Sequence, residues 1–181
     1  MLKDMVQALP NFYFCLYVQP FVGIRWVFKT DSSPRCNLQY GKLSLKKIID
    51  SPYILYVGVR LEYKNFQRLV RAFSIIHVWF PDLKLVCTSF PFNSEEIELL
   101  RHLSILDNVV HISATENQMF QLYRDALFFI YPSIYEGFGM PILEAWACKC
   151  PVLLSNASCF PEIAKDGGLY FDPLSVDDII N

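Results

Sequence analysis

From Pro52 onward, short apolar runs alternate with longer segments in which apolar residues recur at helical spacing. The runs predict buried parallel strands, because a strand covered on both faces carries few polar positions. They cover residues 54–58, 83–87, 109–112, 127–131, 151–154 and 168–171. After the first run, the helical spacing is kept by Phe66, Leu69, Val70, Phe73 and Ile76. This alternation predicts an α/β fold, a Rossmann-like parallel sheet with helices on both faces.

Three helix starts are visible in the polar residues that precede the apolar positions. Asn65 is expected to cap the helix after the first strand. Ser94 opens the next helix, with two glutamates in its first turn that favour the helix dipole. Thr115 and Gln118 form a capping box for a third helix, which we expect to end at Asp125.

The first 50 residues follow a different pattern. Residues 11–28 are rich in aromatic side chains but are broken by polar residues, proline and glycine, and no run reaches the roughly 20 residues that span a bilayer. A buried hairpin and an interfacial segment both fit, and residues 30–40 have the composition of a loop or linker. We therefore separate residues 1–50, an aromatic-rich segment and linker with no assigned chemistry, from a domain over residues 51–181.

Composition narrows the function classes. The chain of 181 residues is 53% hydrophobic and 15% aromatic, which excludes a disordered protein. Its net charge of -2, without a basic block, gives no indication of a nucleic-acid partner. The six cysteines show no paired CxxC spacing, and most lie in apolar runs, which favours a reducing compartment. Cys148 and Cys150 fit a metal or redox pair less well than core positions at a helix end. No secretory signal is visible.

The most informative stretch lies between residues 133 and 146. Gly137 and Gly139 flank Phe138, so the backbone can turn sharply and approach a ligand. Pro141 suits the first turn of a helix, and free N–H groups with the positive end of its dipole form an anion site. Glu136 in the loop and Glu144 one turn into the helix are expected to border the opening of the same binding site. The N–H groups suit a diphosphate, and the carboxylates suit sugar hydroxyls.

The predicted sheet places this loop beside others. Ligands of such sheets bind outside the carboxyl ends of the strands, where residues 58–64, 88–93, 113 and 133–139 would all lie. We therefore expect these segments to converge on one edge. The fold alone indicates a nucleotide-binding domain. A nicotinamide dehydrogenase is disfavoured, because no G-x-G-x-x-G follows the first strand.

Residues 52–180 resemble the carboxyl-terminal, donor-binding domain of retaining glycosyltransferases with the GT-B fold, group-one family (family 4). The decisive match is Glu136-x7-Glu144 inside Pro132-Ser-x-Tyr-Glu-Gly-Phe-Gly-Met-Pro-Ile-Leu-Glu-Ala. Three further segments agree in order and spacing: residues 56–66, 151–162 and 167–173. One departure is Cys87-Thr88-Ser89, which stands where the family has a Gly-Gly-like turn.

The resemblance implies a role for each matching residue. Gly58 forms the turn before Arg60 and Lys64, which would bind the donor diphosphate. Glu136, the candidate catalytic residue, would bind hydroxyls of the transferred sugar and stabilise positive charge at its anomeric carbon. Glu144 would hold the ribose. The remaining donor contacts would come from the backbone of Ile112, Gly137, Phe138, Gly139 and Met140. No metal or other cofactor is implied, because Arg, Lys and the helix dipole replace it.

The implied function is transfer of a hexose such as mannose or glucose from a UDP- or GDP-sugar to a glycan or lipid-linked acceptor. Complete GT-B enzymes have two domains, and the amino-terminal one recognises the acceptor. We therefore expect residues 51–181 to be a donor-binding domain that is incomplete at its carboxyl-terminal end. A split subunit that docks on a separate acceptor-domain chain, and an inactive gene remnant, are the alternatives. The expected location is cytoplasmic, with at most peripheral contact with the inner face of the membrane.

Overall fold

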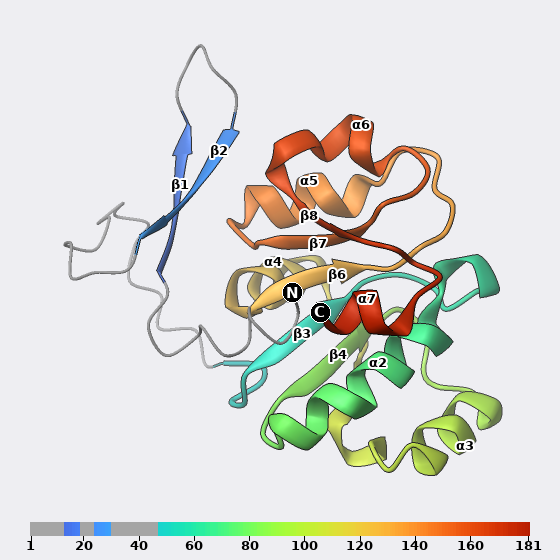
Figure 1. The fold of residues 1–181 in the computed structure, drawn as a ribbon. Helices are drawn as coiled ribbons and strands as arrows, with labels where there is room; N and C mark the ends of the chain where they lie inside the picture. The colour runs from blue at the N-terminus through green and yellow to red at the C-terminus, as the bar shows by residue number, and fades with distance from the viewer. Residues whose placement is uncertain (1–12, 19–23, 30–46) are drawn as a thin grey trace.

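The computed structural model describes residues 13–18, 24–29 and 47–181, with side chains from residue 47 onward. The first two strands, β1 (Tyr13–Val18) and β2 (Ile24–Lys29), pair antiparallel, with Tyr13 opposite Lys29 (Figure 1). This pairing agrees with the backbone of a hairpin, while the burial of its side chains and the interfacial alternative lie outside what the structure describes. The predicted linker over residues 30–40 lies outside the described residues.

A parallel sheet forms the centre of residues 47–181. Its strand order is β5-β4-β3-β6-β7-β8, and every neighbouring pair is parallel (Figure 1). The strands are β3 (Tyr53–Tyr56), β4 (Lys84–Thr88), β5 (Val109–Ile112), β6 (Phe128–Tyr131), β7 (Val152–Ser155) and β8 (Leu169–Phe171). Each predicted apolar run therefore contains or overlaps a strand. β3 ends at Tyr56, so Gly58 belongs to the turn that follows this strand.

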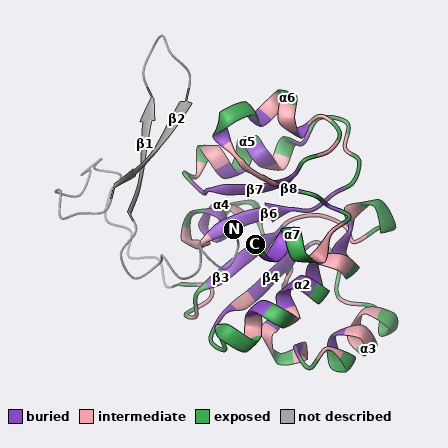
Figure 2. Cartoon of the chain, viewed as in Figure 1, coloured by how far each residue is buried: buried purple, intermediate pink, exposed green. Residues whose placement is uncertain are grey.

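Helices cover both faces of this sheet, as predicted. They are α2 (Phe66–Trp79), α3 (Ser94–His102), α4 (Glu116–Asp125), α5 (Met140–Ala147), α6 (Phe160–Ala164) and α7 (Val176–Ile180). Single 3-10 turns occupy Glu62–Lys64, Leu106–Asn108 and Lys165–Gly167. In one core, α2, α3 and α7 pack against Ile54 and Tyr56, and in the other, α4, α5 and α6 pack against Tyr53 and Leu55. Figure 2 shows the resulting buried strands between partly exposed helices.

The helix starts confirm one capping prediction and correct another. Thr115 caps α4 in the expected box with Gln118. Asn93, which the sequence reading missed, caps α3 in the same way with Glu96. Asn65 occupies the N-cap position of α2 at φ 59, but its side chain does not cap the helix. The amide instead donates to the carbonyls of Pro132 and Pro173, so the prediction of a side-chain cap was wrong.

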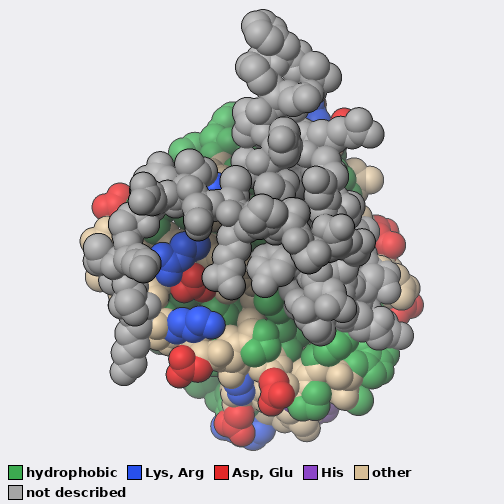
Figure 3. All heavy atoms as spheres, turned by 90° about the vertical axis from the view of Figure 1, so that its left-hand side faces the viewer, with side chains coloured by type: hydrophobic (Ala, Val, Ile, Leu, Met, Phe, Trp, Pro, Cys, Tyr) green, Lys and Arg blue, Asp and Glu red, His purple; other side chains and the backbone are tan. Residues whose placement is uncertain are grey.

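The distribution of charged side chains on the surface agrees with the low net charge of the chain. Figure 3 shows acidic and basic side chains interspersed among the described residues of one side of the molecule. The pair of Arg124 and Asp125, 2.8 Å apart, is an example of such mixing. In the part of the chain that the structure describes, no helix is long and apolar enough to cross a membrane.

Candidate functional site

Two loops meet at the carboxyl ends of the neighbouring strands β3 and β6. The backbone N–H of Ile134 donates to the carbonyl of Tyr63 at 2.8 Å. Beside this bond, Lys64 Nζ lies 2.6 Å from Glu136 Oε1, and each side chain is 12% exposed. The predicted convergence is therefore confirmed for these two loops, and it joins a predicted diphosphate ligand to the predicted catalytic carboxylate.

The loop that carries Glu136 is also fixed from its other side. The backbone N–H of Glu136 donates to Ser158 Oγ at 3.1 Å, and this hydroxyl donates back to the Glu136 carbonyl at 2.8 Å. Burial, followed by the nearby Glu136 carboxylate, raises the pKa of Tyr131 well above its usual range, so this phenol stays protonated. Sequence reasoning missed Ser158, because an isolated serine after a strand gives no pattern from which its partner can be inferred.

The two glycines of the loop have different structural roles. Gly139 has φ +84 at the N-cap of α5, and a Cβ there would lie 3.1 Å from a ring carbon of Phe160. Gly137 lacks a positive φ and faces open space, so only Gly139 is demanded by the turn itself. Between and after them, Phe138 and Met140 are 53% and 57% exposed. The segment thus presents its surface outward at the N-terminus of α5, as an anion site requires.

Glu144 lies exposed on α5 and is bound by a tyrosine. Tyr123 donates its hydroxyl to Glu144 Oε2 at 3.0 Å. Burial raises the pKa of Tyr123 far above its usual range, and the charge of Glu144 and this hydrogen bond raise it further. Tyr123 therefore remains a donor that orients the carboxylate. Sequence reasoning gave no prediction for Tyr123, because its partner Glu144 lies 21 positions away on another helix.

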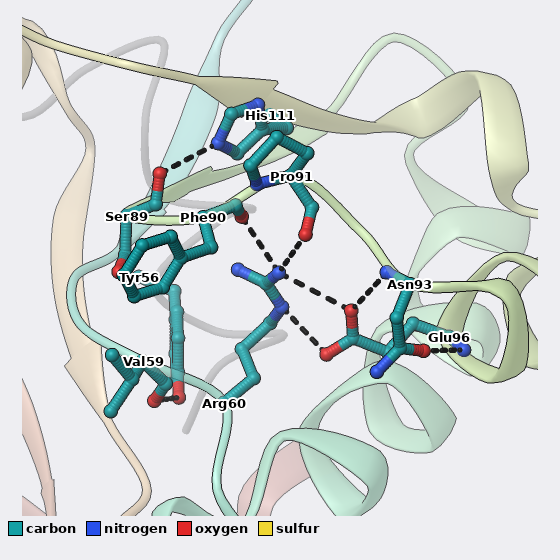
Figure 4. A network of polar contacts seen from close by, with 9 residues as sticks. All are labelled: Tyr56, Val59, Arg60, Ser89, Phe90, Pro91, Asn93, Glu96 and His111. Carbon is teal, nitrogen blue, oxygen red and sulfur yellow. Dashed lines mark hydrogen bonds and ion pairs between the residues drawn. The ribbon is translucent and has the colours of Figure 1, made fainter.

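Arg60 is not paired with the Lys64 site but with a glutamate of α3. Its Nε lies 2.7 Å from Glu96 Oε1, and its Nη2 donates to the carbonyls of Phe90 and Pro91 at 2.7 and 2.8 Å (Figure 4). The Arg60 side chain is only 5% exposed. The two predicted diphosphate ligands therefore have separate carboxylate partners in this structure.

The remaining predicted residues lie at the same edge of the sheet. Gly58, at φ +121, makes the turn after β3. Ser89 adopts φ +89 where the resemblance expected a glycine turn, and its carbonyl contacts the His111 ring at 2.9 Å. Ile112 ends the edge strand β5, which is separated from β3 by β4. It therefore lies away from the Lys64–Glu136 pair.

Possible metal ligands are not clustered in the described part of the chain. Within residues 47–181, no group of three or more His, Cys, Asp or Glu side chains is arranged to hold an ion. Cys148 and Cys150 are free thiols. Cys150 is buried among apolar side chains at the end of α5, which agrees with the core interpretation.

Comparison with known proteins assigns the family. Residues 44–181 match the family described as glycosyl transferases group 1. The chain belongs to this family. It is 32% identical over 134 residues to O-antigen chain mannosyltransferase B of Escherichia coli, covering 70% of this chain and 34% of that protein. It is also 32% identical over 124 residues to O-antigen chain mannosyltransferase RfbU of Salmonella typhimurium, covering 67% and 34%.

Solved structures support the same assignment. The C-terminal domain of the group 1 glycosyl transferase LpcC from Francisella tularensis superposes with a TM-score of 0.61 at 27% identity, covering 72% of this chain and 73% of that one. Sucrose-phosphate synthase from Thermosynechococcus elongatus superposes with a TM-score of 0.59 at 26% identity, covering 73% and 35%. The predicted GT-B-like fold is confirmed. The chain spans about a third of the curated relatives, 34% of each of the two named above.

Proposed function

We propose that this domain binds a nucleotide-diphosphate sugar and positions the sugar for retaining transfer. The observation that carries the proposal is the Lys64–Glu136 pair at 2.6 Å, which joins two strand ends directly before the N-terminus of α5. A carboxylate held in this way can accept hydroxyl protons of a sugar and stabilise positive charge that develops at the anomeric carbon. Lys64 and the helix N-terminus favour the phosphates.

The proposed donor is a UDP- or GDP-hexose. Mannose is the first candidate, because two relatives in O-antigen synthesis are mannosyltransferases, and glucose is the second. The proposed acceptor is a glycan or a lipid-linked saccharide, as in polysaccharide biosynthesis. Glu144, oriented by Tyr123, is assigned to the ribose hydroxyls, and Ile112 to the base.

The leaving nucleoside diphosphate needs positive charge around it. In our proposal, Lys64, Arg60 and the N-terminal turn of α5 supply that charge, so that transfer requires no metal ion. Donor binding measured in EDTA and in excess MgCl2 should then give the same affinity. An affinity that falls by tenfold or more in EDTA would overturn this part of the proposal.

Calorimetric titration with GDP-mannose and UDP-glucose tests the binding function. Lys64→Met should weaken binding of the preferred donor about 10- to 100-fold, because a charge-assisted hydrogen bond to a phosphate is lost. Lys47→Met removes an exposed lysine that precedes β3 and serves as the matched control, with unchanged affinity expected. The proposal fails if the folded wild-type chain binds neither donor, or if both variants bind as the wild type does.

Exposed apolar side chains at the same edge favour contact with a second domain. Tyr135 is 67% exposed, next to the exposed Phe138 and Met140 on the glycine loop and the start of α5. We propose that an acceptor-binding domain, in a longer protein or in a separate chain, covers this surface and excludes water from the site. Residues 51–181 alone should then bind donor but transfer little sugar. Turnover by this chain alone, at the rate seen with an added acceptor domain, would contradict the idea.

A further inference from the structure

The contacts of Arg60 use only part of its hydrogen-bonding capacity. Nε and Nη2 bind the two oxygens of Glu96 at 2.7 and 3.2 Å, and Nη2 also donates to two loop carbonyls. The third nitrogen, Nη1, is buried and has no partner. In Figure 4 it lies on the side of the guanidinium that faces away from Glu96.

Glu96 is itself held rigidly. Its Oε2, which accepts from Arg60, also accepts the backbone N–H of Asn93 at 2.9 Å as part of the capping box of α3. The guanidinium carbon lies 4.8 Å from the centre of the Phe92 ring and 5.6 Å from that of Phe66. The helix start, the carboxylate and the two rings together fix the plane of the guanidinium, and therefore the direction of Nη1.

A buried donor without an acceptor is unfavourable, and such groups are uncommon in folded proteins. An anionic oxygen would supply the missing acceptor. Of the two predicted phosphate ligands, Lys64 uses one of its three N–H donors on Glu136 at 2.6 Å, whereas Arg60 has a buried nitrogen with no partner. Nη1 is shielded from solvent, and a ligand therefore reaches it by displacing neighbouring side chains.

We infer that Glu96 is a positioning residue. It binds Nε and Nη2 of Arg60 and so leaves Nη1 oriented to donate to a diphosphate oxygen of the donor. This inference rests on the proposed function and adds to it a residue outside the motifs of the sequence. Glu96 acts through Arg60 and does not touch the ligand.

The direction in which a charge-removing substitution changes the affinity for an anion distinguishes a positioning role from a purely electrostatic effect. Removing a negative charge near an anion site should strengthen anion binding if only the charge matters. Glu96→Gln should instead weaken it, because the bidentate grip on Arg60 is lost, while Gln still serves in a capping box. Glu95→Gln makes the same change of charge one residue away, on an exposed side chain that bonds none of the Arg60 nitrogens, and is the matched control.

The experiment titrates inorganic pyrophosphate, GDP-mannose and UDP-glucose into wild type, Glu96→Gln, Glu95→Gln and Arg60→Lys, with thermal melting as the folding control. We expect Glu96→Gln and Arg60→Lys to bind pyrophosphate and the preferred donor about tenfold more weakly. Glu95→Gln should bind them equally or slightly more tightly. Arg60→Lys keeps the charge and removes the reserved donors, so it tests the inference even if Glu96→Gln does not fold.

The outcomes are distinct. Equal affinities of Glu96→Gln and Glu95→Gln, or wild-type affinity of Arg60→Lys, would overturn the positioning role while leaving donor binding intact. Pyrophosphate binding that depends on Glu96, without binding of either nucleotide sugar, would refute the proposed function and leave only the positioning role of Glu96 at a diphosphate site. A wild-type chain that does not bind pyrophosphate would refute the inference itself.

Discussion

Asn65→Asp tests whether Asn65 caps α2 or holds three segments together. The Asn65 amide donates to the carbonyls of Pro132 at 3.0 Å and Pro173 at 2.7 Å, and the residue is 5% exposed. Asp has no such donor, so the Pro132 carbonyl loses its donor at a cost of about 1–3 kcal/mol. The Pro173 carbonyl keeps Arg68 Nη1 at 3.2 Å, so the bond lost there costs about 1 kcal/mol. Arg68 Nη1, which lies 2.6 Å from Asn65 Oδ1, would gain an ion pair worth up to about 1 kcal/mol. The expected net loss is therefore about 1–4 kcal/mol.

Urea unfolding followed by far-UV circular dichroism measures this loss. Asp is as good an N-cap residue as Asn and tolerates positive φ, so a capping role predicts almost no change. Asn65→Gly also keeps the backbone at φ 59 but removes the whole side chain, and we expect it to be destabilised as well. If Asn65→Asp unfolds within about 0.5 kcal/mol of wild type, the reasoning is refuted.

Three further predictions concern the Lys64–Glu136 pair, the glycine loop and Tyr123 of α4. A double-mutant cycle with Lys64→Met and Glu136→Gln should give a coupling energy of about 1–2 kcal/mol in urea unfolding, because both side chains are 12% exposed. A coupling energy near zero would show that the ion pair does not stabilise the fold. Gly139→Ala should cost about 1–3 kcal/mol, since φ is +84 and the added Cβ meets a ring carbon at 3.1 Å, whereas Gly137→Ala should change stability by less than about 0.5 kcal/mol. Burial raises the pKa of Tyr123 above its ordinary 10.0, so the contribution of this phenol to stability is complete below pH 10 and is lost as the pH rises beyond it. Tyr123→Phe should therefore flatten the fall of the unfolding free energy at alkaline pH. An unchanged slope would argue against a buried phenol at this position.

Much of the fold could be predicted because its signals are local. Buried parallel strands read as short apolar runs, and the capping box of α4 needs only Thr115 and Gln118, which lie within one turn. The glycine loop was recognised for a similar reason, since the positive φ of Gly139 is a property of its own backbone. The cap of α3 was equally local, and attention to Asn93 would have found it.

The sequence by itself therefore determined the α/β pattern and the loop before α5, and it supplied the residues that we propose for a donor site. Only the tertiary structure decided which of these residues bind one another. Arg60 and Glu96 are 36 positions apart, Lys64 and Glu136 are 72 apart, and Asn65 and Pro173 are 108 apart. The physical reason is the strand order, which brings β6 beside β3 and their loops into contact, and which no local pattern of polar and apolar residues specifies.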